Sequence, residues 1–522
     1  MSTAEPARAA TGETRAGVHG VAAPPTPAPS PELVRDLAER AGRPDFSKLE
    51  AQLRSSGYCA RPVRLRGHVE TCGRDGRARR VWSTDAEPDG VLRKACGNRR
   101  EAVCPPCAER YRQDAYHLIA AGLRGGKGVP DNVAGHPLVF VTLTAPSFGA
   151  VHTRATGPDG QPRRCRPRHD ASTCPHGVSL SCAAVHADGD PCLGEPLCPE
   201  CFDYDGALLW NNLLGELWRR TTIYLPRALA RLLGITQKQL RRLVRVSYVK
   251  VAEYQRRGLV HLHVVIRLDR AMPAYRATDV RPPSERFTLE LLEEGVRAAA
   301  SAVTAPAPEE AGGGFLRWGD ELEVLHITGD RGIEPGRCAG YLAKYATKAT
   351  EQAGGVLHRV TQHEVDALPV RAHVHSYLRR AFALGEDAAL ADRRLGRYAH
   401  AFGYRGHCLT KSRRYSTTFK ALREARERHV HKQLLARSRD PAQRALAATA
   451  PEDRIAFFTY AGRGHLTTAD AFLAASAAAR ARERRRIAWE ERCFRRLDGN
   501  RRRVPETRGH DLELVTGGRA DE

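Results

Sequence analysis

The amino-acid sequence predicts an α+β protein of more than one domain, and three observations support this prediction. Compact runs rich in β-branched residues, such as 136–144 and 259–269, are typical of strands. Other segments, such as 108–123, carry apolar residues at helical spacing and end near paired glycines. With 522 residues, the chain is longer than one ordinary domain and can bury a sizeable core.

The chain is strongly basic. It has 83 Lys and Arg residues against 60 Asp and Glu residues, a net charge of +23. This excess favours a polyanionic partner, most simply nucleic acid, although a generally basic proteome rich in Arg and Ala is an alternative explanation. Neither a signal peptide nor a membrane span of about 18 apolar residues is present, so we expect no membrane partner and a cytoplasmic location. In that compartment the 14 cysteines are expected to be thiols or metal ligands.

Composition divides the chain into successive regions. In chain order they are a disordered N-terminal tail with one short helix at 31–40 (1–45), a cysteine-containing zinc region (46–130), a domain that carries the chemistry (131–350), a basic DNA-contacting region (351–435) and a helical Arg/Ala-rich tail (436–522). A cysteine-rich insertion at 152–205 interrupts the third region. It has too few apolar residues for a core of its own, so we expect metal to hold it.

The remaining elements follow from the same patterns. Strands are expected at 244–253, 259–269 and 321–327, helices at 205–234, 338–350 and 475–503, and a loop at 301–314. Residues 255–258 (QRRG) separate the first two strands, which are therefore expected to form a hairpin.

Two histidines share one face of the second hairpin strand. The period of two places alternate apolar residues on one face and His261 and His263 on the other, where two imidazoles can chelate a divalent ion. Glu253 joins them if it pairs with His261, which requires a connection longer than a tight four-residue loop, or a bulge. His326, on a separate strand, is the reserve ligand. Surface histidines and a solvated strand end are the alternative interpretation.

Two tyrosines share one face of the helix expected at 338–350. Tyr341 and Tyr345 are four residues apart, and Lys344 and Lys348 each follow a tyrosine by three residues. A phenol has a pKa of about 10 and is a poor nucleophile at neutral pH, but a nearby ammonium group and a divalent ion favour the phenolate. The alternative is a helix with two half-buried aromatic residues and two lysines that extend to solvent.

Three motifs in this order resemble those of the HUH-type rolling-circle replication initiators, and especially initiators of actinobacterial plasmids and integrative conjugative elements. Residues 140–144 (FVTLT) resemble the first motif, 261–263 (HLH) the metal motif, and 341–348 (YLAKYATK) the tyrosine motif in its two-tyrosine form. The wider likeness includes CGNRREAVCPPC at 96–107 and FGYRGHCLTKSRRYSTTFKALRE at 402–424, and it covers most of 58–430.

The resemblance implies an HUH endonuclease core at 131–350, with a central antiparallel sheet and flanking helices. It also implies a metal-dependent, site-specific endonuclease that uses Mg²⁺ or Mn²⁺ to nick single-stranded or supercoiled DNA at a replication origin. The tyrosine would join to the 5′-phosphate and leave a 3′-OH for a host DNA polymerase. Some relatives have Glu at the position of Tyr341, so Tyr345 is expected to attack first. Because no G-x-x-x-x-G-K-[ST] sequence is present, we expect a host helicase to separate the strands.

Two Cys-x-x-Cys pairs predict structural Zn²⁺, with redox cysteines or unligated thiols as the alternative. The first pair is Cys104 and Cys107, which Cys59 and Cys96 would complete, with Cys72 as an alternative. The second pair, in the insertion, leaves open whether one or two ions are bound. Its assigned ligands are Cys174, Cys182, Cys198 and Cys201, with Cys165, His176, His186 and Cys192 as further candidates.

A cationic stretch with interleaved aromatic residues follows the tyrosine motif. Lys411, Arg413, Arg414 and Tyr415 suit phosphate contacts and base stacking, although a solvated helix face is the alternative. Two other functions remain open for the whole chain. One is a non-catalytic, zinc-dependent DNA-binding regulator, and the other is a two-tyrosine transposase or relaxase.

Overall fold

In a computed structural model of the chain, the structure describes residues 30–72, 78–168, 173–272, 280–309, 313–328, 332–437 and 454–501. The fold is α+β with antiparallel sheets, as the sequence predicts. The chain divides into a larger unit, built mainly on residues 96–455, and a smaller unit, built on residues 29–68, 82–95 and 456–522. No described helix combines the length and the apolar character needed to cross a membrane. The disorder expected for the first thirty residues lies outside the described residues.

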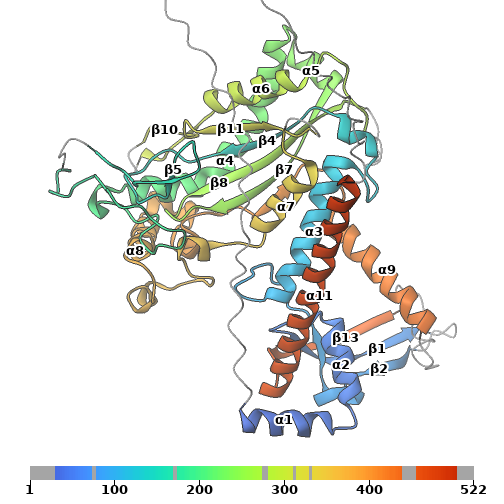
Figure 1. The fold of residues 1–522 in the computed structure, drawn as a ribbon. Helices are drawn as coiled ribbons and strands as arrows, with labels where there is room; N and C mark the ends of the chain where they lie inside the picture. The colour runs from blue at the N-terminus through green and yellow to red at the C-terminus, as the bar shows by residue number, and fades with distance from the viewer. Residues whose placement is uncertain are drawn as a thin grey trace, which may run out of the picture. The chain divides into compact units, whose positions relative to one another are not determined.

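A five-stranded antiparallel sheet forms the centre of the larger unit (Figure 1). Its strands, in spatial order, are β11 (Leu322–His326), β4 (Leu138–Leu143), β8 (Val260–Arg270), β7 (Val244–Tyr254) and β12 (Leu409–Lys411). Every residue of β4 is buried, which explains why its sequence is almost continuously apolar. The central strand β8 pairs with β4 on one side and with β7 on the other.

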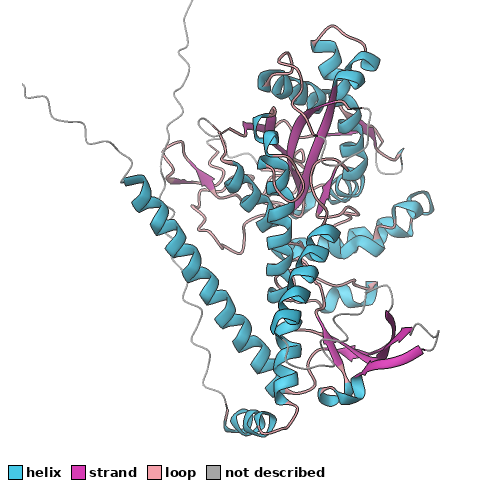
Figure 2. Ribbon diagram, turned by 90° about the vertical axis from the view of Figure 1, so that its right-hand side faces the viewer, coloured by secondary structure: helices cyan, strands magenta, loops and turns pink. Residues whose placement is uncertain are grey.

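Helices cover both faces of this sheet (Figure 2). On one face, alternate β8 residues such as Leu262 and Val264 pack into the core formed with α4 (Tyr204–Leu232), α6 (Leu289–Ala302) and α8 (Ala372–Glu386). On the opposite face, Val265 packs with α3 (Pro105–Arg124) and α7 (Pro335–Tyr345). His263 alternates with these residues and therefore belongs to the α3–α7 face.

Shorter elements complete the larger unit. They are β5 (Ala155–Thr156), β6 (Pro162–Arg163), α5 (Gln237–Leu243), β9 (Thr304–Pro306), β10 (Phe315–Arg317) and α9 (Phe419–Arg437). The pairing of β9 with β10 corrects the expectation that 301–314 is entirely loop.

A second sheet, with strand order β13-β1-β2 and β3 paired to β1, lies mainly in the smaller unit. Its elements are α1 (Pro31–Ala41), α2 (Phe46–Ser55), β1 (Val63–Cys72), β2 (Ala78–Ser83), β3 (Leu92–Lys94), β13 (Arg454–Arg463) and α11 (Thr468–Arg501). The expectation of a wholly helical tail at 436–522 is therefore wrong at β13. The sequence IAFFTY at 455–460 is rich in aromatic and β-branched residues, which favour a strand despite the flanking Ala- and Arg-rich segments.

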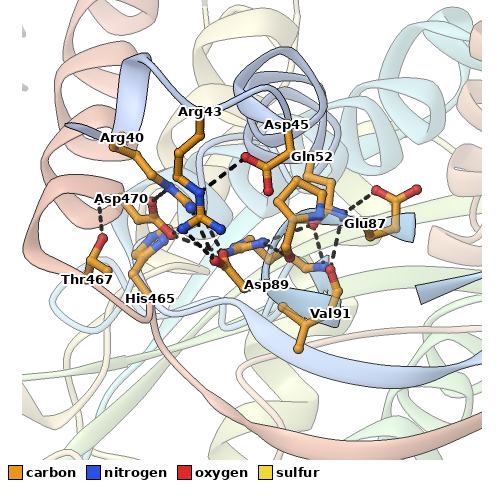
Figure 3. Close-up of polar contacts among 12 residues, drawn as sticks. Arg40, Arg43, Asp45, Gln52, Glu87, Asp89, Val91, His465, Thr467 and Asp470 are labelled. Carbon is orange, nitrogen blue, oxygen red and sulfur yellow. Dashed lines mark hydrogen bonds and ion pairs between the residues drawn. The ribbon is translucent and has the colours of Figure 1, made fainter. Parts of the chain in front are cut away.

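A buried ion-pair network joins three segments of the smaller unit (Figure 3). Arg40 on α1 donates to Asp89 and, at 2.8 Å, to Asp470 at the start of α11. Arg93 on β3 donates to Asp470 at 3.0 Å, and neither side chain is exposed. Because each buried charge has an opposite charge beside it, the network holds α1 in the folded unit. Residues 31–45 are therefore not part of a disordered tail.

Candidate metal and nucleophile site

Glu253 pairs with His261 across the β7–β8 hairpin. Residues 255–259 connect the strands, and Gln255 N–H donates to Leu259 O at 2.8 Å. Gly258 adopts the left-handed conformation, with a φ of +82°, that closes such a turn. This connection is longer than a four-residue loop by one residue, which places Glu253, His261 and His263 on one face of the sheet.

The three side chains converge on one point. Glu253 Oε2 lies 2.9 Å from His261 Nε2 and 2.7 Å from His263 Nε2. Neighbouring ligands of an octahedral ion with bonds of roughly 2.0–2.1 Å lie about 3 Å apart, so these atoms fit the adjacent positions around one divalent ion. Two imidazoles and a carboxylate suit a transition ion such as Mn²⁺ better than Mg²⁺, which prefers oxygen ligands.

The protonation states also suit a metal. Burial disfavours a charged Glu253, but the hydrogen bonds with His261 and His263 keep the pKa of this carboxyl below its ordinary value. Burial also lowers the pKa of His263, which is only 2% exposed. An ionised carboxylate and a neutral imidazole are the forms that bind metal.

His263 is oriented by residues on the two neighbouring strands. Thr142 lies opposite His263 and Glu323 lies opposite Thr142. Thr142 Oγ1 lies 3.2 Å from Glu323 Oε2 and 3.2 Å from His263 Nδ1. The hydroxyl has one hydrogen, which it donates to the carboxylate, so it accepts from His263 Nδ1–H. When a metal ion is bound, a neutral His263 with its proton on Nδ1 would present the lone pair of Nε2 to that ion.

Thr142→Val is expected to weaken Mn²⁺ binding about 10- to 100-fold. The substitution keeps the shape of the side chain, but without the hydroxyl nothing at this position fixes the proton on His263 Nδ1. Calorimetric titration of the full chain with Mn²⁺ measures this change. Thr144→Val is the matched control, because the Thr144 hydroxyl donates to Glu321 O at 2.8 Å and does not contact His263. Equal affinities for the Thr142 variant and the wild type would show that the hydroxyl does not orient the ligand.

Both tyrosines of α7 adjoin the metal-ligand set. Tyr341 Oη lies 3.5 Å from His263 Nε2, and the Tyr345 ring centroid lies 5.6 Å from that of His263. The two tyrosine rings are 4.7 Å apart. On the other side of α7, Leu342 and Ala343 are buried in the core, which turns the phenols toward the histidines. Tyr341 remains 39% exposed and so can be reached by a large substrate.

The tyrosines are protonated at neutral pH in the absence of a cation. Burial raises the pKa of Tyr345, and the negative charge of Glu253 raises it further. Burial, Tyr345 and Glu253 act in the same direction on the pKa of Tyr341. A divalent ion would oppose these effects, because its charge stabilises the phenolate.

The helix ends earlier than predicted, and this separates the two lysines. Helix α7 stops at Tyr345, because Thr347 and Lys348 N–H donate to carbonyls only three residues back and form a tight turn. Lys348 therefore does not flank the tyrosines along a helix face, and its ammonium lies 3.3 Å from Glu101. Lys344 Nζ lies 5.5 Å from the Tyr345 ring centroid and is the lysine beside the site.

His326 does not join the metal ligands. It lies on the face of β11 that Val324 occupies, and its Nε2 lies 2.7 Å from Glu293 on α6. Glu323, on the opposite face of β11, is the residue that sequence reasoning missed. The period of two in 321–327 assigns Glu323 to one face of the strand. That this face adjoins His263 can be inferred only if β11 is known to pair with β4.

The expected DNA-contacting residues at 411–415 have unequal exposure. Tyr415 is fully buried and donates its hydroxyl to Ile119 O at 3.1 Å, so the expectation that it stacks on a base is wrong. Lys411 is partly buried, and burial lowers the pKa of its ammonium group. Arg413 is exposed and Arg414 is half-buried. Contact of these two arginines with DNA phosphates therefore stays a prediction.

The predicted zinc ligands fall into several groups. Cys96 Sγ lies 3.7 Å from Cys107 Sγ, and Cys104 is buried in the same unit. Cys59, the fourth predicted ligand, is also buried. The side chain of Cys72, the alternative ligand, lies outside the residues whose side chains the structure describes. In the insertion, one group of candidate ligand atoms contains Cys174, Cys198 and Cys201, and a second contains Cys182.

Comparisons with known proteins agree with the resemblance in the motifs. Residues 45–479 match the family described as "Replication initiator protein, pSAM2" (RepSA). A protein of Streptomyces ambofaciens described as a replication initiator protein is 40% identical over 468 residues, a match that covers 86% of this chain and 93% of that protein. No solved structure matches significantly. The chain therefore belongs to the RepSA family of replication initiator proteins.

Proposed function

We propose that this initiator nicks one DNA strand at its origin through a tyrosine nucleophile and later rejoins the strand, and that it thereby starts rolling-circle replication. Membership in a replication-initiator family implies DNA binding at an origin. The observation that carries the nicking mechanism is the meeting of two phenols with a His-His-Glu set on one face of an antiparallel sheet.

The residues have distinct proposed roles. Glu253, His261 and His263 would hold a divalent ion, Mn²⁺ or Mg²⁺, which would supply positive charge near the scissile phosphate and the attacking oxygen. The Tyr345 phenol loses its proton and forms a bond to phosphorus. The bond from phosphorus to the 3′-oxygen breaks, and this oxygen takes up a proton and leaves as a free 3′-OH.

A host DNA polymerase would extend this 3′-OH while a host helicase separates the strands. Tyr341 is close enough to Tyr345 to cut a second time on the same protein, after which the released 3′-OH can attack the first phosphotyrosine. This attack restores a phosphodiester bond and breaks the bond from phosphorus to the Tyr345 oxygen, which takes up a proton. Lys344, beside Tyr345, adds positive charge near the phosphate. A non-catalytic DNA-binding regulator would not need this arrangement.

Tyr345→Phe is expected to reduce covalent adduct formation on single-stranded origin DNA by at least about a thousandfold, because the attacking oxygen is lost. Tyr341→Phe is expected to keep the first adduct and to lose rejoining. Denaturing gels with end-labelled DNA and Mn²⁺ measure both steps. Tyr116→Phe is the matched control, because Tyr116 is a half-buried tyrosine of α3 whose hydroxyl accepts from Arg124 at 3.1 Å.

Other outcomes have defined meanings. A reversed order of the two tyrosines would exchange their roles but retain the chemistry. Undiminished nicking by the variant that lacks both hydroxyls would exclude a tyrosine nucleophile here. Strand transfer into unrelated DNA would instead support the transposase alternative.

A further inference from the structure

The cysteine-rich insertion has almost no apolar core. Between residues 152 and 201, the described side chains that are buried are mainly those of metal-binding residue types. The buried residues of this segment are Cys165, Cys174, His186, Leu193, Gly194, Pro196 and Cys198. A segment of this length with so little buried apolar surface needs another source of stability, and a bound metal is one.

One group of ligand atoms surrounds His176. Its Nδ1 lies 3.3 Å from Cys201 Sγ, 3.7 Å from Cys198 Sγ and 3.9 Å from Cys174 Sγ. Ligand atoms around a tetrahedral Zn²⁺, with bonds of roughly 2.3 Å to sulfur and 2.0–2.1 Å to nitrogen, lie about 3.4–3.8 Å from one another. The three distances from His176 lie within this range or about 0.1 Å outside it, so the group fits a Cys₃His site.

A second group surrounds His186. Its Nε2 lies 3.3 Å from His152 Nδ1 and 3.5 Å from Cys182 Sγ, and Cys165 Sγ belongs to the same group, whose ligand atoms all lie within 4.8 Å of one another. These distances match a Cys₂His₂ site by the same geometry. The backbone N–H of Thr153 also donates to Cys165 Sγ at 3.1 Å.

His186 has the support that a zinc-bound histidine usually has. Its Nδ1 lies 2.9 Å from Asp190 Oδ2, so Nδ1–H can donate to this carboxylate while Nε2 faces the other ligands. Cys192 Sγ lies 3.3 Å from Nδ1 but 3.9 Å from Nε2. Because it is nearer to the nitrogen that faces Asp190, Cys192 is not chosen as the fourth ligand.

We propose that the insertion binds two structural zinc ions. Cys174, His176, Cys198 and Cys201 hold one ion, and His152, Cys165, Cys182 and His186 hold the other. Cys182 therefore binds a different ion from Cys174, Cys198 and Cys201, although the prediction from the sequence placed these four cysteines together. Along the chain the ligand pairs alternate between the ions, so each ion closes a loop that contains a ligand pair of the other. Two interleaved crosslinks restrict the segment more than two successive loops would.

The zinc-binding segment packs against the hairpin that carries Glu253 and His261. Arg256, in the β7–β8 connection, donates to Asp190 O at 3.2 Å. A Cβ on Gly194 would lie only 2.5 Å from the backbone carbon of Arg256, so the two backbones are in close contact. Arg371 donates to Leu193 O at 3.0 Å from the other side. The two ions would therefore support the turn that sets the register of the metal-ligating strands.

Zinc analysis of the purified full-length protein tests whether the insertion binds metal. Cys198→Ser/Cys201→Ser is expected to remove at least one equivalent of zinc per chain relative to the wild type. Cys408→Ser, outside the insertion, is the matched control and should remove none. A double variant with the zinc content of the wild type would overturn the proposal.

Cadmium NMR tests the assignment of ligands to two ions, because the cadmium resonance moves with the number of thiolate ligands. The substitutions His176→Cys and Cys182→His exchange one ligand type for another and so should preserve binding. Each is expected to move a different resonance, the first toward a four-sulfur site and the second toward a one-sulfur site. Movement of the same resonance by both, or of none by either, would overturn the assignment.

Discussion

Glu253→Ala is expected to reduce nicking by at least about a thousandfold at limiting Mn²⁺. Glu253 supplies the only carboxylate oxygen of the ligand set, and both histidine Nε2 atoms converge on it at 2.7–2.9 Å. Two neutral imidazoles without this charge bind a divalent ion weakly. Loss of about 4 kcal/mol of transition-state stabilisation corresponds to this factor.

The rate of adduct formation on single-stranded origin DNA across a series of Mn²⁺ concentrations measures this effect. Glu253→Asp is expected to recover part of the rate at high Mn²⁺, because it restores the charge at a longer distance. His326→Ala is the control, since His326 pairs with Glu293 on the other face of the sheet. An unchanged Mn²⁺ dependence in Glu253→Ala would mean that the ion binds elsewhere.

The fold of the larger unit could be predicted in part because its signals are local. The period of two in β8 assigns Leu262 and His263 to opposite faces, and the structure has this arrangement. The apolar spacing of α3 and α4 likewise predicts their bounds to within a few residues. Each of these signals depends on residues that are neighbours in the sequence.

The remaining features depend on contacts between distant residues. Tyr415 is buried because its ring fills the space beside Gly122 on α3, where a Cβ would lie 2.3 Å from the ring. Glu323 reaches Thr142 only because β11 pairs with β4. The proposed zinc-ligand sets of the insertion depend in the same way on contacts between residues that are distant in the sequence. None of these contacts can be inferred from the spacing of residues along the sequence.

Asp269→Asn is expected to destabilise the larger unit by about 3–5 kcal/mol, the usual loss when one partner of a buried ion pair is removed. The Asp269 carboxylate accepts from Arg267 Nε at 2.6 Å and from Ser247 Oγ at 2.6 Å, and it lies 2.9 Å from His136 Nδ1. Arg267 and Asp269 are both 0% exposed, so the substitution leaves a guanidinium buried without its counter-charge. A lower urea midpoint of the larger unit measures the loss.

The pKa of the Asp269 carboxyl predicts how the stability of the larger unit depends on pH. Burial opposes its ionisation, but His136, Arg267 and Ser247 lower its pKa from 3.8 to about 2. Because the folded pKa lies below the unfolded one, the contribution is fully present above about pH 4 and is lost as the pH falls toward 2. The urea midpoints of the wild type and of Asp269→Asn should therefore converge as the pH falls through this window.

Asp366→Asn, which removes an exposed partner of Arg379, is the control and should keep a constant difference in urea midpoint from the wild type. If the midpoint difference for Asp269→Asn does not change with pH, the buried ion pair is not the source of its stability.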